Sequence, residues 1–111
     1  MSKYRNKKCN IDGIWFDSIR EGRRYSELKL MEKGGYISNL RLQVPYELVP
    51  NQKNREGKVI ERKVVYRADF VYFDNDKQEE VVEDAKGFRT EVYLLKKKLM
   101  LDRYGIQIKE V

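Results

Sequence analysis

Two acidic positions interrupt apolar segments near the middle of the chain. Asp69 lies within Val64–Phe73, and Asp84 and Lys86 lie at the end of the next apolar segment. Because side chains alternate along a strand, Asp84 and Lys86 share one face while Glu83 points to the other. The Asp-x-Lys spacing therefore brings a carboxylate and an ammonium group to one place.

The pairing of these two segments decides how close Asp69 and Asp84 lie, and three registers are open. Pairing of residues whose numbers sum to 153 places the two carboxylates directly opposite each other. A sum of 151, from a turn at Asn75-Asp76, makes them diagonal neighbours that can still share a cation. A sum of 152 places Asp69 opposite Glu83 instead.

Two carboxylates this close repel each other, and they lose hydration on a sheet unless a cation offsets their charge. Oxygen ligands without nearby His or Cys favour Mg²⁺, for which Mn²⁺ can substitute, over zinc. Such an ion holds a scissile phosphate and lowers the pKa of an attacking water. Lys86 would orient or deprotonate that water, or neutralise charge on the phosphate, and the sequence leaves these roles open.

Glu21 is a further candidate, on a predicted helix. It lies four residues before Tyr25 and seven before Leu28, on the stripe that faces the core. A capping-box role after Ser18 is the alternative, and for Glu21 alone it is the commoner one. An isolated Asp-x-Lys is likewise usually a surface ion pair. The combination of all these residues favours a functional site.

The composition is that of one small basic domain. The chain has 111 residues, and 24 Lys and Arg against 18 Asp and Glu give a net charge of +6, which favours nucleic acid as partner. The absence of His excludes His-based zinc sites, Ser-His-Asp triads and HNH nuclease chemistry, and the single Cys9 excludes an internal disulfide. No segment approaches the roughly 18 apolar residues of a membrane span, so we expect a cytoplasmic protein.

Turn residues and apolar periodicity predict the elements that position the site. Asp12-Gly13 indicates a hairpin turn, Gly34-Gly35 and Gly105 end helices, Gly87 ends a strand, and Pro45 suits a sheet edge or bulge. The expected order is hairpin, helix, three strands, helix, strand. The ranges are the hairpin within 7–16, helices Ser18–Lys33 and Thr90–Tyr104, strands Ile37–Val49, Val59–Phe73, Glu80–Ala85 and Ile106–Val111, the loop Pro50–Gly57 and the turn Asp74–Gln78.

A helix Glu, a strand Asp, and an Asp-x-Lys on the next strand before a helix resemble the PD-(D/E)XK nuclease superfamily of restriction enzymes and Holliday-junction resolvases. The chain resembles more closely a phage and prophage family catalogued as a domain of unknown function, which we interpret as small nucleases of this type. The segments that carry the closer resemblance are Phe16-Asp17-Ser18 with Glu21, Arg24-Tyr25, Leu28-Lys29, Leu42-Gln43, Ala68-Asp69-Phe70 and Glu83-Asp84-Ala85-Lys86-Gly87.

The resemblance implies an α/β, restriction-endonuclease-like core, a central mixed sheet flanked by helices. It implies that Asp69 and Asp84 are metal ligands, that Glu21 is a direct or water-mediated ligand, and that Lys86 is the catalytic lysine. The carbonyl of Ala85 would be a further ligand. The sequence departs from the pattern twice: Ala68 replaces the Pro of the superfamily name, and Asp84 stands where Glu is more frequent.

Basic and polar residues after the motif are candidates for contacts to the DNA backbone. They are Arg89, Thr90, Lys96, Lys97 and Lys98. A solvated basic helix face explains the lysines equally well. Gln43 is a candidate through the resemblance alone.

The expected function is a Mg²⁺-dependent endodeoxyribonuclease acting on branched or structured DNA. The resemblance places it in phage recombination, replication or packaging, inside a bacterial host, and suggests a homodimer with one active site for each strand. Two rivals remain open. One is a noncatalytic DNA-binding protein of the same fold, and the other is a protein-interaction module that has no need of Asp69 or Lys86.

Overall fold

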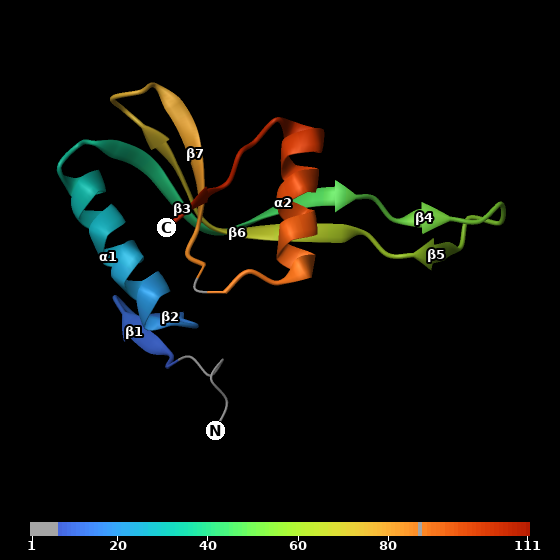
Figure 1. Ribbon diagram of the computed structural model, residues 1–111, viewed down its shortest axis with the longest axis horizontal. Helices are drawn as coiled ribbons and strands as arrows, with labels where there is room; N and C mark the ends of the chain where they lie inside the picture. The colour runs from blue at the N-terminus through green and yellow to red at the C-terminus, as the bar shows by residue number, and fades with distance from the viewer. Residues whose placement is uncertain (1–6, 87) are drawn as a thin grey trace.

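A computed structural model describes residues 7–86 and 88–111 of the chain. A sheet runs through the molecule, two helices pack on it, and a two-stranded arm extends away from it (Figure 1). In chain order the elements are β1 (Cys9–Ile11), β2 (Ile14–Phe16), α1 (Ile19–Lys33), β3 (Ile37–Val49), β4 (Gln52–Lys53), β5 (Val59–Glu61), β6 (Val64–Asp74), β7 (Glu79–Asp84), α2 (Glu91–Tyr104) and β8 (Lys109–Glu110).

The predicted N-terminal hairpin is confirmed. Asp12 and Gly13 both have positive φ, 55° and 80°, as the central residues of a type I′ turn require. The hairpin lies close against α1 at Gly22, where an added Cβ would meet Cys9 Sγ at 2.5 Å. Only glycine therefore allows this approach of hairpin and helix.

Both predicted helices are confirmed, and side-chain caps fix where they begin. The Ser18 hydroxyl accepts the Glu21 N–H over 3.1 Å, and the Thr90 hydroxyl accepts the Tyr93 N–H over 3.0 Å. Gly105, with φ of 68°, ends α2 in the left-handed conformation. No helix among the described residues is long and apolar enough to cross a membrane.

The central sheet has the strand order β3-β6-β7-β8 and is mixed, as predicted. The first three strands are antiparallel, and β8 pairs in parallel with β7. Pro45 lies in β3, an edge strand, where a residue without N–H is tolerated. The α/β class with a central mixed sheet and two helices is therefore confirmed.

The prediction was wrong about the segment before the site. Val59–Phe73 is not one strand, because β5 ends at Glu61 and β6 begins at Val64. β5 pairs with β4, which lies within the predicted loop Pro50–Gly57 (Figure 1). Apolar and β-branched residues indicate an extended chain but not its pairing partner, and here the partner is local.

Two further boundaries moved, both at strand ends. β7 spans Glu79–Asp84 and not Glu80–Ala85, because the chain leaves the sheet directly after Asp84. Only Lys109–Glu110 of the last predicted strand pairs with the sheet. Gly87, predicted to end β7, lies outside the described residues.

Two apolar clusters lie on opposite faces of the sheet. Val81 packs against one and its neighbour Val82 belongs to the other, as alternation along a strand requires. The α1-side cluster contains Phe16, Tyr25, Leu28, Ile37, Phe70 and Tyr72. The α2-side cluster contains Leu48, Tyr66, Ala68, Val71, Val82, Tyr93, Met100 and Ile108.

Candidate active site

The hairpin of β6 and β7 brings the two predicted aspartates together. Its paired residue numbers sum to 153, and the pair nearest the site is Phe70 with Glu83. Extended by one position, this register aligns Asp69 with Asp84, and repulsion from Asp84 contributes to a raised pKa of Asp69. The other two registers that the sequence left open are excluded.

The site lies where β3 and β6 pass from one cluster to the other. Leu42 packs with the α1-side cluster and Val44 with the α2-side cluster, although strict alternation would put both on one face. Gln43 between them has φ of 53°, an uncommon conformation for a residue with a side chain. In β6 the residues on either side of Asp69 are divided between the clusters in the same way.

The Gln43 side chain joins α1 to the sheet at this point. Its Nε2 donates to Glu21 Oε1 over 3.3 Å and to Asp69 Oδ1 over 3.1 Å. Glu21 thus takes part in helix capping through its N–H, while its carboxylate is directed to the site. The sequence suggested Gln43 as a DNA contact, but the structure places it between two of the predicted catalytic carboxylates.

Asp69 and Glu21 both hold protons more tightly than usual. Burial, followed by repulsion from Asp84, raises the pKa of Asp69 to about 6, although the Ala85 N–H donates to its Oδ2 over 2.9 Å. Burial, followed by repulsion from Asp69, raises the pKa of Glu21 to about 7. A cluster of like charges in a partly buried place is stabilised by a proton or a cation.

Asp84 is the most deeply buried of these carboxylates, with 2% of its surface exposed. The Tyr66 hydroxyl donates to its Oδ2 over 2.5 Å, and burial together with this hydrogen bond raises the pKa of Tyr66. Asp84 Oδ1 has no hydrogen bond within the described part of the chain, and Lys86 Nζ lies 3.3 Å from it as an ion pair. A buried oxygen without a hydrogen bond is costly, and it is available to a ligand.

A hollow of about 410 Å³ opens beside these residues. Asp69, Asp84 and Lys86 line it from the sheet side, and Thr90 and Lys96 line it from the start of α2. Its other lining residues are Val65, Tyr66, Arg67, Val92 and Tyr93. Three of the four predicted catalytic residues therefore share one hollow, and the fourth is joined to it through the glutamine described above.

The predicted DNA-binding residues do not form one patch. Lys96 lines the hollow, Lys97 Nζ lies 3.3 Å from Glu110 Oε2, and Lys98 is exposed. Arg89 pairs with the same carboxylate at 3.2 Å. Successive helical residues are about 100° apart around the axis, so three consecutive lysines cannot face one surface.

The described residues contain no group of three or more Cys, Asp or Glu side chains arranged to hold a metal ion. Asp69 and Asp84 nevertheless fit a magnesium site, because Mg²⁺ needs only one or two protein carboxylates and completes its shell with water and phosphate. Two observations support this fit: Asp84 Oδ1 accepts no hydrogen bond within the described part of the chain, and repulsion from Asp84 contributes to the raised pKa of Asp69. Ala85 contacts the site through its N–H, so a ligand role for its carbonyl remains a prediction.

Sequence reasoning missed a second buried carboxylate, that of Glu83. Arg24 donates to it twice, from Nε to Oε1 over 2.8 Å and from Nη2 to Oε2 over 2.6 Å, and the Tyr72 hydroxyl donates to Oε2. We call these three residues the Glu83 clamp. The signal was present, because alternation puts Glu83 on the apolar face opposite Asp84, where a carboxylate needs a cationic partner.

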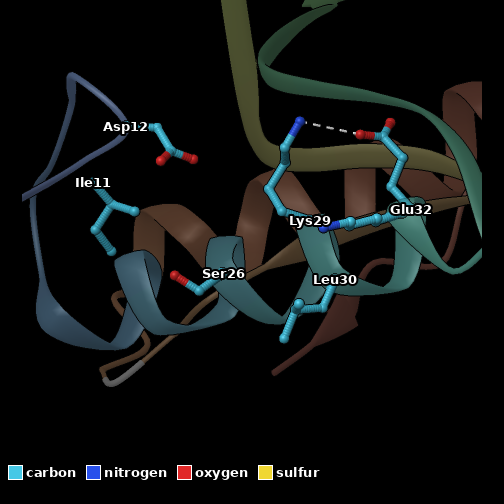
Figure 2. Close-up of a pocket in the computed structure, with 7 residues that line it drawn as sticks. Ile11, Asp12, Ser26, Lys29, Leu30 and Glu32 are labelled. Carbon is cyan, nitrogen blue, oxygen red and sulfur yellow. Dashed lines mark hydrogen bonds and ion pairs between the residues drawn. The ribbon is translucent and has the colours of Figure 1, made fainter.

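A second hollow, of about 580 Å³, lies between the N-terminal hairpin and α1 (Figure 2). Three of its four charged residues have partners within the chain: Lys29 Nζ lies 3.2 Å from Glu32 Oε1, and Asp12 accepts the Tyr25 hydroxyl over 3.0 Å, while Lys33 is exposed. Ser26 and Leu30 from α1 complete the wall shown in Figure 2. We assign no chemistry to this hollow.

One family model matches the chain over residues 1–110, and its description reads "Protein of unknown function (DUF1064)". No curated protein and no solved structure matches the chain significantly. The chemistry must therefore be argued from the site itself.

Proposed function

We propose that this chain, which belongs to the DUF1064 family, is a metal-dependent endodeoxyribonuclease with a restriction-endonuclease-like core. One observation supports this most: a single hollow collects Asp69, Asp84 and Lys86, and Asp84 there keeps a buried oxygen without a hydrogen bond. A carboxylate pair can hold a metal ion that activates water, and an adjacent lysine can neutralise charge on a phosphate, so this residue set is suited to phosphodiester hydrolysis. Mg²⁺ is the ion we propose, and Mn²⁺ its substitute.

Each residue of the site has a task in this proposal. Asp69 and Asp84 would hold the ion, with Glu21 as a direct or water-mediated ligand, and Gln43 keeps Glu21 and Asp69 at a fixed separation. The ion, when bound, supplies a Lewis acid that positions the phosphate and makes water more acidic. The proposed ligand oxygens differ in their existing hydrogen bonds. Both oxygens of Asp69 already accept one, whereas Asp84 Oδ1 accepts none within the described part of the chain.

Lys86 would act on the phosphate in this proposal. Its Nζ lies 3.3 Å from Asp84 Oδ1 and 4.5 Å from the centre of the Tyr93 ring, in the wall of the hollow. An ammonium group held by a carboxylate and an aromatic face is suited to neutralising charge that develops on a phosphate. We therefore favour this role over proton abstraction among the three that the sequence left open.

DNA is the proposed substrate, because the net charge of +6 favours a polyanion. A chain of 111 residues offers little surface for reading bases, so we propose branched or structured DNA recognised by shape and backbone. A homodimer would present two hollows to two strands. The proposed setting is phage or prophage DNA metabolism in the bacterial cytoplasm.

A cleavage assay on linear, flapped and four-way DNA tests the nuclease. Wild-type protein is compared in Mg²⁺, Mn²⁺ and EDTA with Asp69→Asn, and with Asp102→Asn as a control that removes one exposed carboxylate from α2. We expect metal-dependent cleavage by the wild type and by Asp102→Asn, and none by Asp69→Asn. Equal cleavage by Asp69→Asn, or none by any protein, would overturn the proposal.

A noncatalytic DNA-binding protein of the same fold is the second candidate. It is favoured by the hydrogen bonds that Asp69 already accepts from Gln43 and Ala85, which leave this carboxylate satisfied without a metal. The same assay separates the two candidates. This alternative predicts DNA binding that is equal in Mg²⁺ and EDTA, with intact substrate in both.

A further inference from the structure

Residues 50–63 form an arm that leaves the body of the protein (Figure 1). β4 and β5 make a two-stranded sheet of their own, in which Gln52 pairs with Glu61 and Lys53 with Val59. The arm continues β3 and β6 beyond the central sheet. It is therefore an extension of the two strands that carry Gln43 and Asp69.

Side-chain hydrogen bonds give the arm a fixed form. Asn54 Oδ1 accepts the N–H groups of Glu56 and Lys58 over 3.0 and 3.1 Å, which closes the tip. At the base, Asn51 Oδ1 accepts the Lys63 N–H over 2.7 Å. The chain thus forms a shaped ribbon here and not an irregular loop.

The arm has no apolar core to support it. Val59 and Ile60 are 42% and 59% exposed, although both are strong strand formers. A two-stranded ribbon alone is marginal in water and is stabilised by packing on something else. An exposed ribbon with its own hydrogen-bonded tip is therefore suited to contact a partner.

The charge of the arm indicates the kind of partner. It carries five basic residues, Lys53, Arg55, Lys58, Arg62 and Lys63, against two acidic ones, Glu56 and Glu61. In the described part of the chain none of the five basic side chains forms an ion pair. An excess of unpaired cations favours a polyanion and disfavours a second copy of the same arm.

We propose that the arm binds the DNA duplex that extends from the hollow, with its basic side chains against phosphates; this inference rests on the proposed function. The position of the arm supports it, because Val65 and Arg67 line the hollow and the arm ends at Lys63. A two-stranded ribbon is also narrow enough for the major groove.

The length of the arm sets how far this contact reaches. Its tip at Gly57 lies eight residues before Val65 in the chain. At about 3.3 Å per residue the tip is roughly 26 Å from the hollow. That distance is about eight base pairs at about 3.4 Å each. The basic residues in the outer part of the arm, Lys53, Arg55 and Lys58, should therefore matter only for duplex of about this length or longer.

The test compares two triple variants of the full chain. The arm variant is Lys53→Gln, Arg55→Gln and Lys58→Gln, and the control is Lys8→Gln, Lys33→Gln and Lys77→Gln, which removes the same charge from exposed positions elsewhere. Binding is measured by fluorescence anisotropy in EDTA on hairpin-capped duplexes of about 5 and about 15 base pairs, lengths chosen on either side of the expected reach. Circular dichroism melts establish that both variants fold.

We expect the arm variant to bind the long duplex on the order of 10–100-fold more weakly at physiological salt, with the slope of log K against log salt lowered by about two to three. On the short duplex it should bind like the control. Equal loss by both variants, or no loss on the long duplex, would overturn the inference. If the arm variant lost a dimer that light scattering detects in the wild type, and its DNA binding were unchanged, the arm would contact a second copy of the chain and not DNA.

The binding assay on the arm variant and the cleavage assay on the wild type can fail independently of each other. Length-dependent binding through the arm without cleavage by the wild type refutes the nuclease and leaves DNA as the partner of the arm. Metal-dependent cleavage with unchanged binding by the arm variant refutes the arm contact alone.

Discussion

Glu83 and Asp84 are neighbours in β7 and both are buried. They point to opposite faces of the sheet, and their hydrogen bonding differs. On the α1 side, Glu83 receives two hydrogen bonds from Arg24 and one from Tyr72. On the α2 side, Asp84 receives one hydrogen bond, from Tyr66, and keeps Oδ1 without one beside the hollow. A carboxylate whose oxygens both accept hydrogen bonds holds elements together. One whose second oxygen has only an ion pair with Lys86, in the wall of a hollow, is suited to a ligand.

The cationic partners of the two carboxylates also come from different parts of the chain. The Glu83 clamp joins residues 59 positions apart in the chain, so it ties α1 to the sheet. Asp84 pairs with Lys86, two residues later, and this contact ties no distant elements together. The first carboxylate should therefore be important for stability and the second for chemistry.

The largest expected effect is on cleavage, from Asp84→Asn. Asparagine keeps the size of the side chain and can still bond to Tyr66, but it removes the charge that would hold the ion. We expect cleavage to fall by about 10³-fold or more, several kcal/mol of barrier. Glu83→Gln, assayed at a temperature where it is folded, should retain its specific activity. Similar losses of cleavage activity in Asp84→Asn and Glu83→Gln would show that the two carboxylates do not have different roles.

Glu83→Gln should have the largest effect on stability. It removes the buried carboxylate from Arg24, which keeps only its ion pair with the exposed Glu27 at 3.1 Å, and breaking a buried ion pair costs about 3 kcal/mol of unfolding free energy. Urea denaturation measures this loss. Glu80→Gln is the matched control, because Glu80 pairs with Arg41 at 2.9 Å on the exposed surface, where such a pair contributes roughly 1 kcal/mol or less. Equal losses would show that the clamp is only another surface pair.

Glu21→Gln tests whether the site extends from the sheet to α1. The substitution keeps the Ser18 cap, which uses the Glu21 N–H, so unfolding free energy should change by about 1 kcal/mol or less. Cleavage should nevertheless fall substantially, because the charge near Asp69 is lost. Rates equal to wild type at every Mg²⁺ concentration would remove Glu21 from the site and leave Asp69, Asp84 and Lys86.

The smallest expected effect is a pH dependence of stability in EDTA. Folding raises the pKa of Asp69 to about 6 and of Glu21 to about 7, so between about pH 4.5 and 7 the native state binds more protons than the unfolded chain. Stability should therefore fall as pH rises through this window, and a melting series from pH 5 to 7.5 measures it. Asp69→Asn should flatten the trend, and a wild-type melting temperature that rises with pH would contradict it.

Much of the local structure could be predicted from sequence because short-range signals determine it. Asp12-Gly13 fixed the hairpin, and Ser18 and Thr90 marked where the helices begin. The site was predictable to the same degree, since a period of two in β6 and β7 puts Asp69 and Asp84 on one face whenever the numbers of paired residues add to an odd sum, as they do here.

What could not be predicted depends on contacts between distant segments. Alternation placed Glu83 on the apolar face, but nothing in the local pattern identified Arg24 as its partner. The β-prone residues Val59 and Ile60 indicated a strand without showing that it would pair with β4 outside the central sheet. The role of Gln43 was hidden for the same reason, because its two partners come from different elements.

The left-handed backbone conformation of Gln43 lowers stability, while its side chain orders two carboxylates of the proposed active site. A residue with a side chain loses roughly 1–2 kcal/mol in this region, and glycine or asparagine would lose less. Neither reaches as far as glutamine, which contacts Glu21 and Asp69 together. Selection for thermal stability alone would therefore replace Gln43, and a protein that keeps it accepts a strained backbone in exchange for an ordered pair of carboxylates.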